Sequence, residues 1–293
     1  MRVLELFSGL GGWRCALRDR GRVAAAYDVS EAANATYALN HGDFPRAREL
    51  AAVPLHELAA CGADTWLMSP PCQPFCRMGN HQGLEDRRSR AFRHLMDLFS
   101  QAPPDHLVLE NVGGFLGSDA HALLSRHIKA HGMHQVDIQA CPSHFGLPNQ
   151  RPRVFIVASR KPLKVLSQPD LPPRPLADFL DAVEDEGLYL RAEAHTRHYQ
   201  GLDLVEPGDH RSACFIGGYG RRFVGSGSFL KTEHGVRRFS PSEVARLLGL
   251  PEGFRFPGTL SLEARYRLLG NGLSIPVAAW ALDHLRPRQA ADG

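Results

Sequence analysis

One cysteine lies in a setting that favours chemistry over packing. Cys72 occupies the segment Ser69–Phe75 (SPPCQPF), with two prolines before it and one after it. A lone cysteine is usually a buried packing residue, but prolines restrict the backbone, which helps to aim a nucleophile. The apolar run Thr65–Met68 predicts a buried strand before this turn, and open α/β sheets place their chemistry at the carboxyl ends of strands. We therefore predict that Cys72 is the reactive group.

A carboxyl group follows another predicted strand. Glu110 comes directly after His106–Leu109 and before Val112 and a pair of glycines, which predicts partial burial. Burial raises the pKa of a carboxyl group, and such a group can serve as a proton donor. A salt-bridge partner fits the same position equally well, so both roles stay open at this point.

Two arginines alternate just before a further strand. Arg151 and Arg153 precede the apolar run Val154–Ala158, so their side chains are expected on the same side of the chain. Two guanidinium groups on one side suit a phosphate or a carboxylate. A surface ion pair is the alternative.

The first residues have the pattern of a nucleotide-type βα unit. An apolar strand, Val3–Phe7, leads into the glycine-rich turn Ser8–Gly12 and a helix beginning at Trp13. Glycines let backbone N–H groups approach a ligand, and a helix N-terminus favours a negative group. Asp28 follows a second strand, Val23–Tyr27, where an acidic residue accepts hydrogen bonds from ribose hydroxyls. Its alternative role is to cap the next helix.

These elements must be held by a larger architecture. Strands and helices alternate as far as Val154–Ala158, which predicts an α/β fold, a Rossmann-like and mostly parallel sheet covered on both faces. Five of the 21 prolines fall within residues 162–175, which marks a linker or lobe boundary. We predict a catalytic domain over 1–160, a smaller target-recognition lobe over 161–238, and a C-terminal segment, 239–293, that returns to complete the catalytic domain.

The predicted lobe contains a glycine-rich region with aromatic and basic residues. Cys214–Gly220 and Gly225–Ser228 carry these residues, with Arg221 and Arg222 between them. Aromatic and basic side chains together suit splayed-out bases and backbone phosphates, and packing within a small lobe is the alternative. Near the end, the turn Gly270–Leu273 opens an apolar helix, so it either closes a ligand pocket or caps that helix.

Composition sets wide limits. A chain of 293 residues with 43% hydrophobic content can bury one large core or a core and a smaller lobe. The net charge of +3 is weak support for a nucleic-acid partner. The six cysteines show no paired metal-ligand spacing, so we expect no metal site and read them as reduced thiols of a cytoplasmic protein. We expect no signal peptide and no membrane span.

The reactive groups fit one reaction. A thiolate can add to C6 of a pyrimidine while a carboxyl group engages N3, and the addition makes C5 nucleophilic enough to attack an electrophilic methyl group. Loss of the C5 proton and elimination of the cysteine then restore the ring.

With these motifs in this order, the chain resembles the cytosine-5 methyltransferase family over almost all of its length. Phe7–Gly12, Pro71–Gln73, Glu110–Val112, Arg151–Arg153 and Gly270–Asn271 look like the family's motifs. The resemblance implies S-adenosylmethionine as cofactor, Cys72 as nucleophile, Glu110 at N3 and the amino group, and Arg151 and Arg153 as residues that orient the flipped base and its backbone. The cofactor-binding residues that it implies are Phe7, Gly9, Leu10, Gly11, Gly12, Asp28, Val29, Asp64 and Asn271.

The turn around Cys72, the Cys214–Phe215 dipeptide and the glycine-rich region are similar to the small tRNA cytosine-5 methyltransferases, which modify cytosine 38 of an anticodon loop. This similarity implies tRNA as partner, tRNA-Asp before tRNA-Glu, and a monomer. Three residues depart from those usual in the subfamily: Ile216 replaces a threonine, Cys76 replaces a threonine or serine, and Gly272 replaces a serine. The change at Ile216 puts the choice of tRNA in question. The alternatives are a DNA cytosine-5 methyltransferase of a restriction system, a catalytically silent nucleic-acid-binding paralogue and a nicotinamide oxidoreductase.

Overall fold

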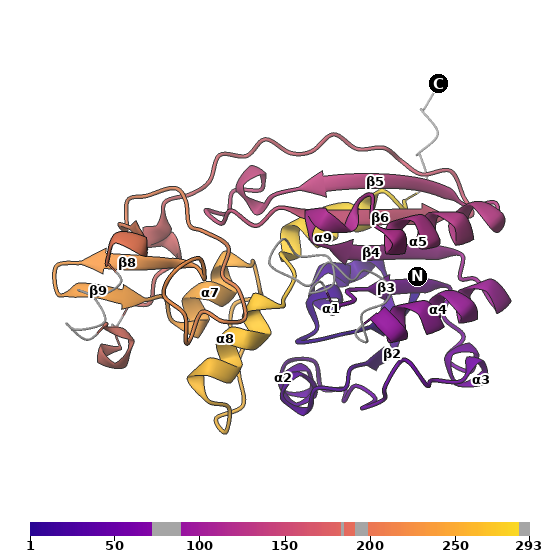
Figure 1. Ribbon diagram of the computed structural model, residues 1–293, viewed down its shortest axis with the longest axis horizontal. Coiled ribbons are helices and arrows are strands. Elements are labelled where there is room, and N and C mark those ends of the chain that lie inside the picture. Colours follow the sequence, from indigo (N-terminus) through magenta and orange to yellow (C-terminus); the bar gives the residue numbers. More distant parts are fainter. Residues whose placement is uncertain (72–88, 183–184, 191–198, 287–293) are drawn as a thin grey trace.

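The computed structural model describes residues 1–71, 89–182, 185–190 and 199–286. Its larger part is built on a six-stranded sheet with the strand order β2-β1-β3-β4-β6-β5 (Figure 1). The strands are β1 (Arg2–Leu6), β2 (Arg22–Tyr27), β3 (Thr65–Met68), β4 (His106–Asn111), β5 (His134–Ala140) and β6 (Arg153–Ser159). The predicted α/β class is confirmed.

Only one side of this sheet is parallel. β1 pairs in parallel with β2 and β3, and β3 pairs in parallel with β4. In contrast, β6 runs antiparallel to both β4 and β5. The reason is the connection 141–152, which holds a short 3-10 turn and no α-helix, whereas parallel neighbours need a long crossover. The mostly parallel sheet of the prediction therefore ends in an antiparallel edge.

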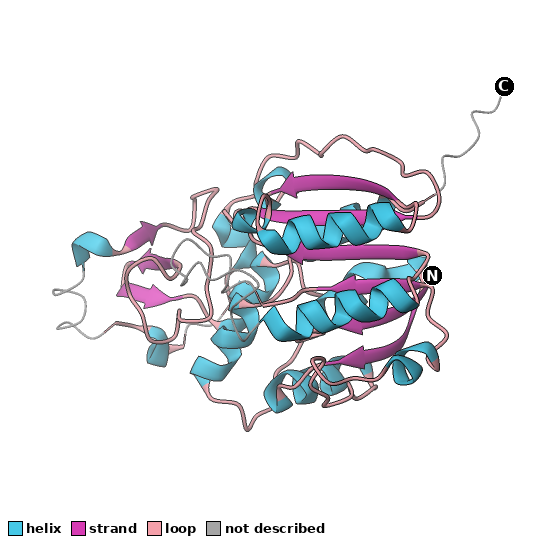
Figure 2. Cartoon of the chain, turned by 45° about the vertical axis from the view of Figure 1, so that its right-hand side comes forward, coloured by secondary structure: helices cyan, strands magenta, loops and turns pink. Residues whose placement is uncertain are grey.

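Helices cover both faces of the sheet. Alternate strand residues point to opposite faces, so Val3 and Leu67 join the core cluster that contains α1 and α9, whereas Leu4 and Met68 join the cluster under α4 and α5. Figures 1 and 2 both show α4 and α5 on one face of the sheet. The helices of the larger part are α1 (Gly12–Leu17), α2 (Glu31–His41), α3 (Leu55–Ala59), α4 (Arg90–Gln101), α5 (Asp119–Ala130) and α9 (Ile275–Asp283).

A smaller lobe is built on a second sheet with the order β7-β8-β9. Its elements are β7 (Asp203–Val205), β8 (Ser228–Thr232), β9 (Gly235–Arg238), α7 (Pro241–Leu247) and α8 (Leu262–Gly270). Figure 1 shows α7 and α8 between the two sheets. The fully buried Glu243 of α7 receives two hydrogen bonds of 2.8 Å from Arg237 of β9. The domain boundaries at residues 160 and 238 stay a prediction.

Some element ends differ from the sequence prediction. β1 stops at Leu6 because Phe7 adopts a left-handed backbone, with φ of 58°. α1 ends at Leu17 and is followed by a 3-10 turn, and β4 continues through Glu110 and Asn111. Across the ranges described above, no helix combines the length and the apolar character that a membrane span requires.

Candidate active site

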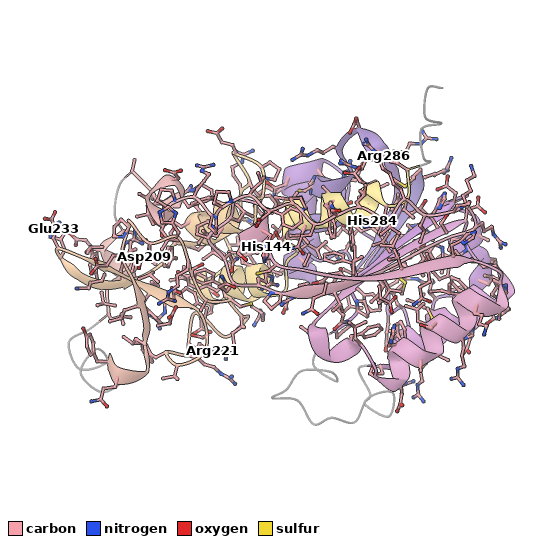
Figure 3. All side chains as sticks on the ribbon, turned by 90° about the horizontal axis from the view of Figure 1, so that it is seen from above. His144, Asp209, Arg221, Glu233, His284 and Arg286 are labelled. Atoms are coloured by element: carbon pink, nitrogen blue, oxygen red, sulfur yellow. The ribbon has the colours of Figure 1, made fainter. Side chains whose placement is uncertain are left out.

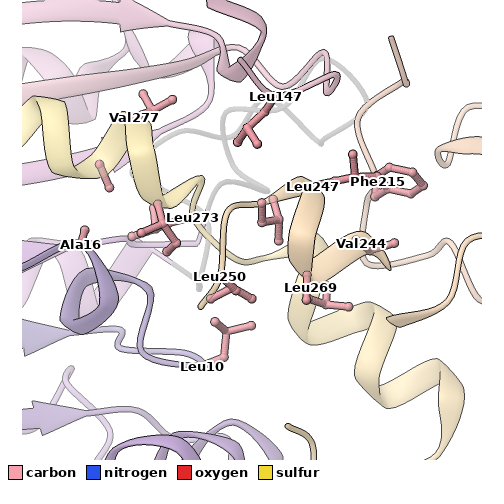
Figure 4. Packing of buried hydrophobic residues seen from close by; sticks show 14 of the residues in the cluster. Leu10, Ala16, Leu147, Phe215, Val244, Leu247, Leu250, Leu269, Leu273 and Val277 are labelled. Carbon is pink, nitrogen blue, oxygen red and sulfur yellow. The ribbon is translucent and has the colours of Figure 1, made fainter. Parts of the chain in front are cut away.

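A cavity of about 470 Å³ opens between the larger sheet and the smaller lobe. The carboxyl ends of β1, β2, β3 and β4 contribute to its lining, together with the turn after α8. Figure 4 shows Leu10, Leu250 and Leu273 in the apolar cluster that joins the glycine turn to the segments around α7 and α9. The fold thus brings the first and the last predicted motifs to one place.

The glycine turn forms one wall of this cavity. Phe7, Gly9, Leu10 and Gly12 line it, whereas Gly11 does not. A Cβ at Gly11 would lie 2.3 Å from Nε2 of His41, and φ there is +89°, so Gly11 is needed for packing against α2. Phe7 is a non-glycine residue with positive φ, which costs free energy and is typical of functional sites.

Asp28 fastens this turn to the end of β2. Its Oδ2 accepts a hydrogen bond of 2.8 Å from the Gly9 N–H, and its Oδ1 accepts one of 2.8 Å from the Ser30 N–H. Ser30 is the residue that caps α2, because its hydroxyl accepts from the Ala33 N–H. The neighbouring Val29 is 65% exposed and lines the cavity. Asp28 and Val29 therefore both face the space predicted for a cofactor.

The structure does not bring Asp64 to the cavity, which corrects the sequence prediction. Asp64 precedes β3, so it lies at the amino end of the strand, and the cavity is at the carboxyl ends. Its Oδ1 accepts from the Arg2 N–H at 2.9 Å and from the Thr65 hydroxyl at 2.6 Å. Asp64 joins the starts of two strands.

Glu110 lies buried in the wall of the cavity. Its Oε1 is 3.2 Å from Nε of Arg153, so the ion pair considered from the sequence is present. Burial raises the pKa of the Glu110 carboxyl, and the charges of Arg153 and Arg151 and a hydrogen bond from Ser69 oppose this shift. An ion pair and a raised pKa coexist here, so Glu110 is held in place and still able to carry a proton.

The turn that leads to Cys72 is held by hydrogen bonds from two other segments. Ser69 Oγ accepts a hydrogen bond of 3.0 Å from the indole N–H of Trp13, and Asn111 Nδ2 donates to the Pro70 carbonyl at 3.1 Å. Ser69, Pro70 and Pro71 all line the cavity. Cys72 and Cys76 themselves lie outside the described residues, and the nucleophile stays a prediction.

Arg151 has a different setting from the one expected. The residue is 2% exposed, and its guanidinium donates to the carbonyls of Phe215, Gly270 and Gly272, at 3.1, 2.9 and 2.6 Å. It also donates to Sγ of Cys214 at 3.3 Å. The observed Arg151 thus joins two segments that flank the cavity, and these partners are protein groups.

Cys214 lies behind the two arginines that line the cavity, a setting that the sequence did not reveal. Arg151 and Arg153 both contact its sulfur, so the two guanidiniums do lie on the same side. Burial acts to raise the pKa of the Cys214 thiol, but the charges of these two arginines outweigh it and the pKa is lowered. Only the fold could show this, because the contacts join residues about 60 positions apart.

Two residues of the α8 end complete the lining. Asn271, predicted for the cofactor, lines the cavity directly after α8. Arg267, which the sequence analysis did not single out, also lines it and is exposed. A basic residue one helical turn before the Gly270–Asn271 motif was the available signal.

Comparison with known proteins places this geometry in context. Residues 1–199 and 216–285 match the family model described as C-5 cytosine-specific DNA methylase. The tRNA (cytosine(38)-C(5))-methyltransferase of Bos taurus is 30% identical over 95% of this chain and 97% of its own length.

Solved structures are similar over the same extent. The crystal structure of the Schizosaccharomyces pombe Dnmt2 methyltransferase has a TM-score of 0.87 and 27% identity, and covers 97% of both chains. The Entamoeba histolytica methyltransferase EhMeth has a TM-score of 0.92 at 24% identity, covering 98% of this chain and 99% of its own. The latter similarity concerns the fold.

Proposed function

Because the chain belongs to the family of C-5 cytosine-specific DNA methylases and is a cytosine-C5 methyltransferase, we propose that its substrate is tRNA and its target cytosine 38 of an anticodon loop. One observation carries this proposal: relatives named for that reaction match at 30% identity over nearly the whole of both chains. The lobe of three short strands agrees with it, since an anticodon loop already presents unstacked bases. We favour tRNA-Asp, with tRNA-Glu as the second choice.

In the proposed reaction, the Cys72 thiolate forms a bond to C6 of the cytosine. Glu110 donates its proton or a hydrogen bond at N3, which accepts the electron pair displaced by the addition. C5 then bonds to the methyl group, whose bond to the donor's sulfur breaks so that the demethylated donor leaves. A base removes the C5 proton, the Cys72–C6 bond breaks to restore the ring and the thiolate, and any proton held by N3 returns to Glu110. Arg153, 3.2 Å from Glu110 Oε1, orients that carboxyl group.

The cavity fits S-adenosylmethionine as the methyl donor. Ser8 Oγ is buried without a hydrogen-bond partner among the described residues, and Ser8 lines the cavity. Each Asp28 oxygen accepts one backbone N–H and keeps a second lone pair, which can accept from a ribose hydroxyl. Phe7, Val29 and Asn271 would contact the remaining groups. The bound cofactor supplies an electrophilic methyl group.

DNA is the second candidate substrate, because the matching family model is described by DNA methylation. The deciding experiment measures transfer of labelled methyl from S-adenosylmethionine to total tRNA and to duplex DNA, with the Cys72→Ala and Cys76→Ala variants as a matched pair. We expect label on tRNA alone, lost in Cys72→Ala and retained in Cys76→Ala. Label on DNA alone would overturn the tRNA assignment, and near-normal rates in Cys72→Ala would overturn the covalent mechanism.

We also infer that the protein acts in the cytoplasm as a monomer. Four cysteines in the described part of the chain, Cys15, Cys61, Cys141 and Cys214, are free thiols, as in a reducing compartment. Size-exclusion chromatography with light scattering tests the monomer, and a dimer would contradict it.

A further inference from the structure

Arg267 stands apart from the other arginines of the candidate active site. Arg151 is engaged by carbonyls and Arg153 by Glu110. Arg267, in contrast, has no hydrogen bond or ion pair from its guanidinium to any residue of the described ranges, although its backbone carbonyl accepts from the Asn271 N–H at 3.3 Å. An arginine that lines a cavity and has no partner in the described part of the chain is available to a ligand.

The usual partner of such an arginine is engaged elsewhere. Glu263 precedes Arg267 by four residues on α8, the spacing at which helical ion pairs form. However, Glu263 Oε2 is 3.6 Å from Nε of Arg221, which Figure 3 labels in the smaller lobe. The positive charge of Arg267 is therefore left beside the cavity.

The position of Arg267 indicates which ligand it meets. A Cβ at Gly217 would lie 3.6 Å from Cγ of Arg267, so the side chain runs beside the glycine-rich loop of the smaller lobe. A Cβ at Gly270 would lie 2.1 Å from the Gly217 nitrogen, so only glycine permits this close approach of helix and loop. The turn predicted for the cofactor, around Gly9, belongs to the larger sheet instead.

We propose that Arg267 binds a backbone phosphate of the nucleic acid next to the target cytosine. Its planar guanidinium can donate two parallel hydrogen bonds to one phosphate, and phosphate contacts fix the position of the substrate while base contacts specify the sequence. Arg267 is thus a positioning residue that presents the cytosine to Cys72 and Glu110. This inference rests on the proposed function in requiring a nucleic-acid substrate.

The test compares Arg267→Ala and Arg267→Lys with the wild-type protein. The control is Arg126→Ala, which removes another exposed helical arginine, outside the cavity. Binding of total tRNA is measured at several salt concentrations, and binding of S-adenosylmethionine is measured by calorimetry. We expect Arg267→Ala to weaken tRNA binding about tenfold and to reduce the slope of log K against log salt by ~0.7. The affinity of Arg267→Ala for S-adenosylmethionine should stay at the wild-type value. Arg126→Ala should keep the wild-type tRNA affinity and salt slope.

Arg267→Lys provides a second test of the phosphate contact. It keeps one positive charge, so the salt slope should return while the affinity recovers in part. An unchanged tRNA affinity and slope in Arg267→Ala would overturn the proposal. Weaker cofactor binding with an unchanged slope would assign Arg267 to the cofactor carboxylate and also overturn it. If the wild-type protein methylates only duplex DNA, the proposed function fails. The salt slope measured on that DNA then tests the phosphate contact separately, because Arg267→Ala is expected to reduce it by ~0.9.

Discussion

Arg151 donates a hydrogen bond of 2.9 Å to the carbonyl of Gly270, a residue 119 positions later in the chain. The same guanidinium holds the Phe215 carbonyl of the smaller lobe. One side chain therefore links the entry of β6, the Cys214–Phe215 segment of the smaller lobe and the end of α8. A buried guanidinium that satisfies several carbonyls at once makes these segments depend on one another.

Replacing Arg151 should loosen this whole wall of the cavity. Arg151→Ala leaves buried carbonyls without donors, so we expect the free energy of unfolding to fall by about 3 kcal/mol. Because Gly270 and Gly272 flank Asn271, cofactor affinity should fall together with substrate affinity. Urea unfolding measures the free energy of unfolding, and calorimetry measures the cofactor and substrate affinities. The surface variant Arg160→Ala is the control. Wild-type stability in Arg151→Ala would contradict this role.

Glu110 should impose a pH dependence on catalysis. Burial raises the pKa of its carboxyl against the opposing charges of Arg153 and Arg151, and the protonated form is the one that donates at N3. The kcat should therefore fall as the pH rises through this raised pKa. Glu110→Gln should lower kcat by about 10²- to 10⁴-fold and remove that limb of the profile. A Glu110→Gln enzyme that retains both the rate and the limb would exclude Glu110 as the acid.

Glu5 should make stability depend on pH near neutrality. This fully buried residue of β1 accepts hydrogen bonds from the Tyr37 hydroxyl and the Arg14 N–H. Burial raises the pKa of its carboxyl from 4.5 to about 7, although these hydrogen bonds favour the charged form. The folded state thus keeps a proton that the unfolded chain releases above about pH 4.5, so stability declines as the pH rises to about 7, by about 3 kcal/mol in total.

The variant Glu5→Gln tests this directly, because an amide does not titrate in either state. Relative to wild type, Glu5→Gln should gain stability steadily as the pH rises from about 5 to about 7, in urea unfolding at a series of pH values. Parallel pH profiles for the two proteins would show that Glu5 does not change its protonation in this range.

The pair Arg237–Glu243 should be the strongest link between the small sheet and α7. Both side chains are buried, and Glu243 also accepts from the N–H groups of Asp181 and Ser240. Removing one partner leaves an uncompensated buried charge, so Arg237→Met and Glu243→Gln should each cost about 3 to 5 kcal/mol of unfolding free energy. The double variant should cost less than the sum of the two, and strict additivity would show that the pair does not act as a unit.

Local patterns in the sequence predicted the elements well. The run Thr65–Met68 is β3 without change, because a short apolar run between two turns is typical of a buried strand. The glycine turn and Asp28 also follow the strands predicted for them, β1 and β2, since both positions depend on neighbours in sequence. For Glu110, the two alternatives from the sequence turned out to be compatible, because an ion pair with Arg153 does not offset the full effect of burial.

What the sequence did not provide depends on distant contacts. The family resemblance implied that Asp64 binds the cofactor, but Asp64 lies at the other end of its strand. Its hydrogen bonds to Arg2 and Thr65 at the amino ends of β1 and β3 became visible only in the fold. Arg151 was expected to meet a phosphate or a carboxylate, with a surface ion pair as the alternative. Its partners from residues 214–272 became visible only in the fold. Arg267 was missed although it lies one helical turn before the Gly270–Asn271 motif, because only the fold shows that it lines the cavity.

The packing of α9 against α1 has a consequence for synthesis of the protein. Gly12 at the start of α1 lies against Leu273, and Arg20 after α1 pairs with Asp283 at 2.9 Å. On the ribosome, the nascent chain releases the glycine turn long before α9. Until then, the apolar side of α1 lacks its contacts with α9, and this core is incomplete. A complete fold around the glycine turn therefore requires the synthesis of α9, and a fragment that stops before α9 has the early motifs without their packing partner.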